Sequence, residues 1–213
     1  MAPESITQER IYNAIKGDYL DGLYRPGARI DLHSIADRHR ASTTPVREAI
    51  HRLIGEQLFE PHIDGGFQIA LPDPLRLGHL YTWYCQQLLG ALHMLHETAL
   101  ARALEPFREG DIVEGNLRQA QRTAMIFQAI ASATNNLEIA QHISRANERL
   151  HYPRLAENNL ITRVGQDLRN LTRNGHTSGI SNIRRRIMAY HDRRIQQAAD
   201  IIAGMQHLAS PPT

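Results

Sequence analysis

Residues 42–53 read Ser-Thr-Thr-Pro-Val-Arg-Glu-Ala-Ile-His-Arg-Leu. Their apolar side chains recur at the spacing of one helical face, and they are Val46, Ala49, Ile50 and Leu53. The polar side carries Thr43, Arg47 and His51. This pattern predicts an amphipathic helix that buries one stripe and presents an arginine on its other side. The helix is expected to begin near Ser42 or Thr44, and Pro45 favours Thr44 as its N-cap.

The flanking residues predict the rest of a small domain. Helices are expected over 5–21 and 31–38, and short strands over 58–60 and 67–69. Between the strands, Gly65-Gly66 supplies the positive φ that a tight hairpin requires. This order of elements is that of a winged helix-turn-helix, which places one helix in the major groove of DNA.

Positive charge supports DNA binding only in one part of the predicted N-terminal domain. Residues 1–72 hold eight Lys/Arg and ten Asp/Glu, so the segment as a whole is not basic. Within it, four arginines lie within fifteen residues, close to His33, His39 and His51; they are Arg38, Arg40, Arg47 and Arg52. A local basic face is enough for phosphate contacts, although a solvated pair of arginine-rich helices fits the same pattern.

Composition and missing motifs exclude other classes. The chain of 213 residues has one cysteine, Cys85, so we expect no internal disulfide and a cytoplasmic location. No secretory signal pattern is present, and no apolar run approaches the roughly 20 residues of a membrane span. There is no P-loop, dinucleotide fingerprint or nucleophile elbow, so we expect neither an enzyme nor a cofactor.

The remainder of the chain reads as helices. Leu71-Pro72-Asp73-Pro74 interrupts the pattern and marks a predicted boundary between domains 1–72 and 73–213. Beyond it we expect helices at about 75–104, 109–133, 135–151, 154–173 and 181–208. The predicted fold class is therefore mainly α, with an N-terminal winged helix-turn-helix followed by an all-helical bundle.

The first 70 residues resemble the GntR family of bacterial transcription regulators. The resemblance rests on four motifs: Gly-Leu-Tyr-Arg-Pro-Gly at 22–27, Ile-Ala at 35–36, Ser-Thr-Thr-Pro-Val-Arg-Glu-Ala-Ile at 42–50, and the glycine pair at 65–66. It implies base or phosphate contact by Arg47, and backbone contact by Ser42, Thr44 and Gly65. The family usually has arginine where this chain has Thr43, and threonine cannot make the bidentate guanine contact.

Further DNA contacts are expected from the local basic face. Arg38, Arg52 and His33 complete the predicted DNA-binding set, with Thr43 as a contact to a thymine methyl group or a phosphate. A single recognition helix reads only a few base pairs, so we expect a homodimer on an inverted-repeat operator in double-stranded DNA.

The helical region resembles the FCD, or FadR-like, effector domain of the same family. The similarity covers Phe127-Gln128, Asn135-Asn136-Leu137 and the terminal His207-Leu208. Many FCD domains hold a metal at four positions, which fall here on Ala124, Gln128, Arg184 or Arg185, and His207. One histidine without a carboxylate is a poor zinc or nickel site, so we predict no metal.

An arginine in place of a metal ligand suggests a guanidinium anchor for a small, acidic effector. The candidate effector-binding residues are Gln128, Arg184, Arg185, His207 and Tyr84. In the alternative interpretation, Arg184 and Arg185 are solvated and His207 caps a helix end.

Two other functions remain open at this point. A helical-bundle enzyme with an accessory winged helix is one alternative. Glu148 and His151 have the spacing used in di-iron bundles, but the only second pair, Glu48 and His51, lies in the predicted recognition helix, so a di-iron oxidase is discounted. A partner-binding module, with its interior filled by side chains, is the other. The leading hypothesis is a ligand-responsive transcriptional regulator whose effector, operator sequence and sign of regulation the sequence does not identify.

Overall fold

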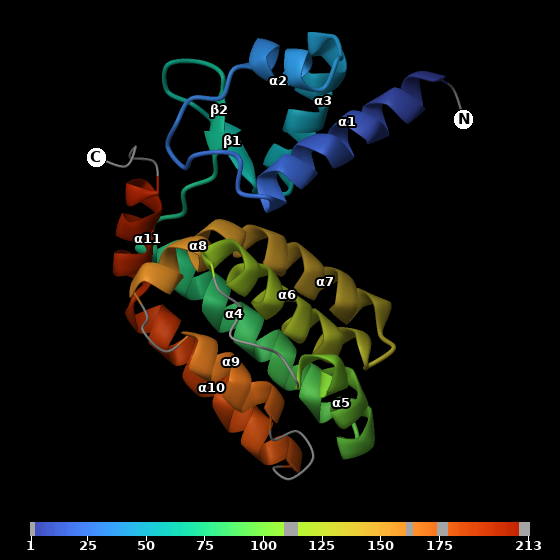
Figure 1. Cartoon of the computed structure of the whole chain (residues 1–213), viewed down its shortest axis with the longest axis vertical. Coiled ribbons are helices and arrows are strands. Elements are labelled where there is room, and N and C mark those ends of the chain that lie inside the picture. The colour runs from blue at the N-terminus through green and yellow to red at the C-terminus, as the bar shows by residue number, and fades with distance from the viewer. Residues whose placement is uncertain (1–2, 109–114, 161–163, 174–178, 209–213) are drawn as a thin grey trace. The chain divides into compact units, whose positions relative to one another are not determined.

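The computed structural model describes residues 3–108, 115–160, 164–173 and 179–208 (Figure 1). The chain forms two compact units, one made of Met1–Leu71 with Met205–Thr213 and the other of Pro72–Gly204. The fold class is mainly helical, as predicted, with a winged helix-turn-helix at the N-terminal end and a helical region after it.

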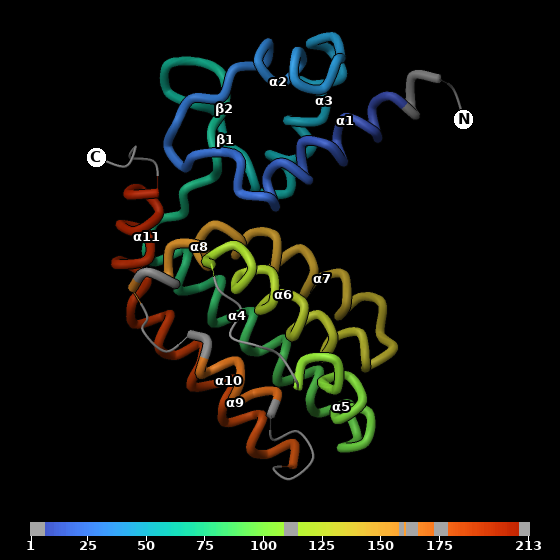
Figure 2. Tube along the Cα trace, viewed as in Figure 1, coloured from blue at the N-terminus to red at the C-terminus, as the bar shows by residue number. Residues whose placement is uncertain are grey.

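Residues 3–71 form three helices and a hairpin: α1 (Pro3–Leu20), α2 (Leu32–Arg38), α3 (Thr43–Gly55), β1 (Phe59–Pro61) and β2 (Phe67–Ile69). Asp31 caps α2, because its carboxylate accepts hydrogen bonds from the backbone N–H groups of His33 at 2.9 Å and Ser34 at 3.2 Å. Helix α1 packs along α3 (Figure 2), and Ile11, Ile15 and Ile50 are fully buried between them and the hairpin.

The start of α3 differs from the prediction. The helix begins at Thr43 with Ser42 at the N-cap position, so Thr44 is not the cap. Pro45 is the third helical residue, where it is tolerated because the first four N–H groups of a helix have no intrahelical acceptor. The predicted buried stripe is confirmed in full.

The hairpin is antiparallel, and Phe59 pairs with Ile69 while Pro61 pairs with Phe67. The first strand therefore starts one residue later than predicted. A further bridge joins Ile30 to Phe67, which ties the residue before the N-cap of α2 to the wing.

The described residues of the rest of the chain form α-helices, one short 3-10 helix and no strand. They are α4 (Pro74–His93), α5 (Glu97–Leu104), η1 (Glu105–Phe107), α6 (Asn116–Ser132), α7 (Leu137–Arg149), α8 (His151–Leu160), α9 (Val164–Arg173), α10 (Gly179–Gln196) and α11 (Ala198–His207). In the second unit α4 packs along α10, and α6 packs against α7 and α8. None of the described helices is long and apolar enough to cross a membrane.

Two of the long predicted helices are broken. The predicted helix 75–104 ends at His93 and resumes at Glu97, and the predicted helix 181–208 divides at Gln197. Apolar spacing continues through both breaks, with Leu95 buried in the first, so periodicity alone does not locate them. The predicted helix 154–173 corresponds to α8 and α9, and residues 161–163 between them lie outside the described residues. Residues 109–114, at the start of the predicted helix 109–133, also lie outside the described residues.

Candidate nucleic-acid interface

The polar side of α3 is open to solvent. Thr44, Arg47 and His51 are exposed, and Thr43 is half-buried. No hydrogen bond or ion pair joins Arg47 to another described residue, so its guanidinium is uncommitted. A rigid helix with an uncommitted arginine at its exposed N-terminal half is suited to reading base edges or binding phosphates.

A hairpin wing lies next to this helix in the same unit. The backbone N–H of His62 donates to the carbonyl of Gly66 at 3.1 Å, and the N–H of Gly65 donates to the carbonyl of His62 at 3.0 Å. The ring of His51 on α3 meets the ring of Phe67 on β2 edge-on, at 6.1 Å between centroids. This contact is one link between the wing and the helix.

The two wing glycines have the same backbone and different surroundings. Both have φ of +79°, which disfavours any residue with a Cβ. A Cβ on Gly66 would lie 2.9 Å from the backbone carbonyl oxygen of Ile30, whereas a Cβ on Gly65 would meet nothing within 4 Å.

We therefore expect Gly66→Ala to destabilise the first unit by about 2–4 kcal/mol, since backbone strain adds to a backbone clash. Gly65→Ala is the matched control and should cost only about 1–2 kcal/mol, the strain alone. Urea unfolding followed by far-ultraviolet circular dichroism measures both variants. Equal losses would show that the Ile30 carbonyl moves away without penalty.

Other residues in the predicted DNA-binding set have partners within the fold. Arg52 donates to Glu9 at 2.8 Å, and its guanidinium stacks 3.6 Å from the ring centroid of Tyr12. Arg38 lies 3.4 Å from the carboxylate of Asp18. Arg52 thus joins α3 to α1, a structural role that the sequence pattern did not reveal.

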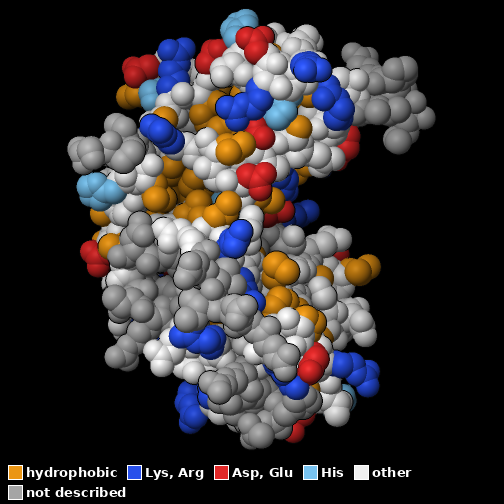
Figure 3. All heavy atoms as spheres, viewed as in Figure 1, with side chains coloured by type: hydrophobic (Ala, Val, Ile, Leu, Met, Phe, Trp, Pro, Cys, Tyr) orange, Lys and Arg blue, Asp and Glu red, His pale blue; other side chains and the backbone are white. Residues whose placement is uncertain are grey.

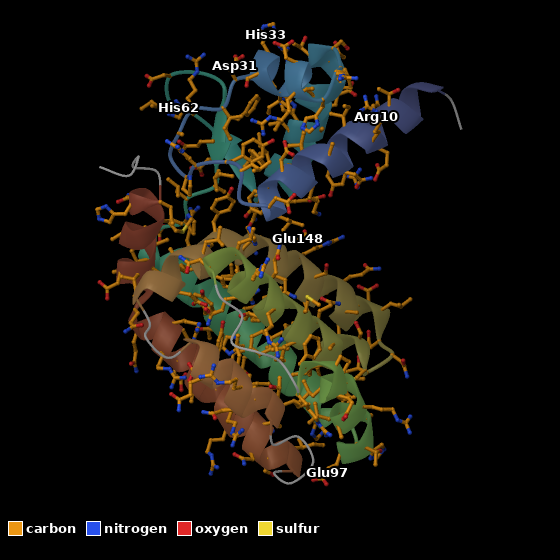
Figure 4. All side chains as sticks on the ribbon, in the orientation of Figure 1. Arg10, Asp31, His33, His62, Glu97 and Glu148 are labelled. Carbon is orange, nitrogen blue, oxygen red and sulfur yellow. The ribbon has the colours of Figure 1, made fainter. Side chains whose placement is uncertain are left out.

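The remaining members are exposed. His33 points away from the ribbon near the start of α2 (Figure 4). Ser42 and Gly65 are also exposed, and the side chain of Ser42 makes no capping hydrogen bond. Lys and Arg side chains are interspersed with acidic ones over this unit (Figure 3), so positive charge is local, as the sequence indicated.

The predicted effector-binding residues differ in their exposure to solvent. Tyr84 is fully buried, and Gln128 is half-buried and donates to the carbonyl of Ala140 at 3.1 Å. Arg184, Arg185 and His207 are exposed. The side chains of Arg184 and Arg185 face solvent, as in the alternative interpretation, and the guanidinium anchor stays a prediction.

A buried polar cluster that sequence reasoning missed lies inside the second unit. Its members are Tyr81, Tyr84, Asn147, Arg154, Glu157, Tyr190, His191 and Arg194. At its centre the carboxylate of Glu157 lies 2.7 Å from Nε of Arg194, with the two side chains 1% and 0% exposed. Glu157 also accepts hydrogen bonds from Tyr81 at 3.4 Å and Tyr190 at 3.3 Å.

Burial controls the protonation of this cluster. It lowers the pKa of His191 to about 3, with further lowering by the nearby Arg194 and Arg154, so the imidazole is neutral at physiological pH. Burial likewise raises the pKa of Tyr84 to about 12. The cluster also holds the guanidinium groups of Arg154 and Arg194, and the Arg194 guanidinium forms the ion pair with Glu157.

The donor set does not fit the metal that the family resemblance implies. Two of the aligned positions are Ala124 and Gln128, and Arg184 and Arg185 are exposed cations. Within the residues that the structure describes, no group of three His, Cys, Asp or Glu side chains is placed to hold a metal ion. The metal-free character of the site stays a prediction.

Comparison with known proteins agrees with the N-terminal geometry. Residues 7–69 match the model of the bacterial regulatory proteins, gntR family. No curated protein matches the chain. A solved structure described as a putative transcriptional regulator GntR from Rhodococcus sp. RHA1 is 18% identical, has a TM-score of 0.75, and the match covers 90% of this chain and 96% of that one.

A second solved structure, E. coli McbR/YncC, is 18% identical with a TM-score of 0.64, over 93% of this chain and 98% of that one. At such identities the likeness shows the fold alone. It extends over most of the chain, including the helical region.

Proposed function

Because residues 7–69 belong to the gntR family of bacterial regulatory proteins, we propose that this DNA-binding transcriptional regulator recognises an inverted-repeat operator as a homodimer. The single observation that carries the proposal is the uncommitted, exposed Arg47 on the polar side of α3. One such helix reads only a few base pairs, so two-fold pairing of heads is needed for useful specificity.

The proposed contacts divide by chemistry. Arg47 reads a base edge in the major groove or binds the adjacent phosphate. Ser42 and Thr44 donate to phosphates, because hydroxyl groups near a helix N-terminus approach the DNA backbone with little charge to desolvate. Thr43 contacts a thymine methyl group or a phosphate, and Gly65 brings the wing backbone close to the DNA.

His33 and Arg38 would extend the phosphate contacts around α2. Arg52 contributes only where it can leave Glu9, so we assign it mainly to holding α1 and α3 together. We further propose that the protein acts in the cytoplasm and that a small, acidic molecule bound in the helical region shifts its operator affinity. Such a shift requires the effector to bind two arrangements of the protein with different affinities.

The decisive experiment is an anisotropy titration of the protein's own upstream DNA at one stated salt concentration. Arg47→Ala should weaken operator binding by about 5- to 150-fold, equivalent to roughly 1–3 kcal/mol. If Arg47 reads a base, the loss appears on the operator and not on scrambled DNA. If it binds a phosphate, both DNAs lose affinity and the salt slope falls by about 1.

Arg102→Ala is the matched control, since Arg102 is an exposed arginine on α5 whose side chain makes no hydrogen bond or ion pair with another described residue. It should bind DNA as the wild type does. Sedimentation at micromolar protein tests the dimer in parallel. A monomer that binds no upstream DNA, or an Arg47→Ala variant that binds like wild type, would overturn the proposal.

A further inference from the structure

The wing hairpin carries acidic side chains and no lysine or arginine. Residues 59–69 read Phe-Glu-Pro-His-Ile-Asp-Gly-Gly-Phe-Gln-Ile, so the only formal charges are those of Glu60 and Asp64. The side chain of Asp64 is 79% exposed. Nδ1 of His62 accepts a hydrogen bond from the backbone N–H of Asp64 at 3.1 Å, so that nitrogen carries no proton. A wing of this composition needs a cation from another segment to approach DNA, which is densely negative.

Arg29 is anchored beside the wing by the backbone of the next residue. The N–H of Ile30 donates to the carbonyl of Phe67 at 2.7 Å, and the N–H of Phe67 donates to the carbonyl of Ile30 at 3.1 Å. This bridge joins Ile30 to the first residue of β2. The backbone at Arg29 is therefore held next to the wing, although 35 residues lie between Arg29 and Gly65 in the sequence.

The side chain of Arg29 lies against the wing glycine Gly66. A Cβ built on Gly66 would lie 3.4 Å from Nε and 3.6 Å from Cγ of Arg29. Arg29 is exposed, and its side chain makes no hydrogen bond or ion pair with another described residue. It differs in this respect from Arg38 and Arg52, which pair with carboxylates of α1. The wing thus has one uncommitted guanidinium alongside it.

We propose that Arg29 enters the minor groove beside the major groove that α3 occupies, and that it makes the protein prefer A·T pairs there. A·T-rich minor grooves are narrow and have a more negative potential, which attracts an inserted arginine. A G·C pair places the N2 amino group of guanine in that groove and disfavours a cation. The inference rests on the proposed function, because it requires a winged helix bound to DNA.

The test uses the full-length protein and the shortest fragment of its own upstream DNA that binds. Three neighbouring base pairs at a time are replaced by inosine·cytosine or by guanine·cytosine. These two pairs are alike in the major groove, and only guanine adds an amino group in the minor groove. Where Arg29 lies in the groove, the wild type should bind the inosine DNA at least about 5-fold more tightly than the guanine DNA in an anisotropy titration.

Arg29→Ala should bind the inosine and guanine versions equally, and should lose at least about 5-fold on the inosine DNA. Arg29→Gln keeps much of the stem that lies against Gly66 and removes the charge, so it should behave as Arg29→Ala does and decides the question if the alanine variant fails to fold. Arg102→Ala, at an exposed arginine of α5, is the matched control and should keep the wild-type preference.

Equal binding of inosine and guanine DNA by the wild type at every position would overturn the proposal. So would a preference that survives in Arg29→Gln. If Arg29 binds a phosphate instead, its variants lose affinity equally on both DNAs and the salt slope falls by about 1, which also contradicts minor-groove recognition. Binding that depends on Arg47 and is indifferent to Arg29 removes this inference alone, whereas a protein that binds no upstream DNA removes the proposed function as well.

Discussion

Glu157→Gln is expected to destabilise the helical region by about 3–5 kcal/mol, because it removes the carboxylate that forms the buried ion pair with Arg194. The glutamine keeps the size of the side chain, so the loss reports the charge rather than a cavity. Arg194 depends on this carboxylate most directly, since its Nε and Nη2 lie 2.7 and 3.3 Å from the two oxygens. Urea unfolding followed by Trp83 fluorescence measures the change.

Glu138→Gln provides the matched control for this variant. Glu138 lies in the first turn of α7, its side chain is 80% exposed, and it is 3.9 Å from His142. Exposed pairs of this kind contribute little, so the control should shift stability by less than about 1 kcal/mol. Similar losses in the two variants would mean that water reaches Glu157 and Arg194 and screens their charges.

The recognition helix could be predicted from the sequence because its signal is local and periodic. Its buried side chains follow one helical stripe, and the glycine pair fixes the turn of the wing. The error at Thr44 also has a local cause, since proline is compatible with any position of the first helical turn and so does not locate the cap.

The buried cluster was missed because charged residues are assigned to the surface by default. One pattern would have pointed to it: Arg194 falls four residues after Tyr190 and seven after Ile187, on the apolar stripe of α10. Arg184 and Arg185 lie off that stripe and are exposed. In α10, a position on the apolar stripe predicts a buried arginine better than alignment with a metal-ligand position of the family does.

The sequence could not distinguish the structural roles of Arg38 and Arg52 from the DNA-binding role proposed for Arg47, because all three arginines lie in the same basic stretch. Their partners Asp18 and Glu9 come from α1, more than nineteen residues away along the chain. Only the packing of α1 on α3 shows that Arg52 is held by the fold while Arg47 is left uncommitted.

Acid should weaken the helical region, because two of its buried histidines resist protonation. Burial lowers the pKa of His191 to about 3, and burial together with Arg154 lowers the pKa of His151 to about 4. In the unfolded chain both imidazoles have a pKa of about 6.5. Below that value the unfolded state takes up protons that the folded state refuses, so stability is full above about pH 6.5 and falls as the pH drops.

Each histidine contributes a slope of about 1.4 kcal/mol per pH unit, down to about pH 4 for His151 and about pH 3 for His191. Together they should remove about 3 kcal/mol between about pH 6.5 and about pH 5. Urea unfolding at a series of pH values, followed by Trp83 fluorescence, measures this slope. His191→Asn keeps a donor for the Ile187 carbonyl and removes one titration, so its slope should be half that of the wild type. His93→Asn, at an exposed histidine of α4, is the matched control and should keep the full slope. A wild-type stability that does not change across this pH range would show that His191 and His151 are hydrated and take up protons in the folded protein.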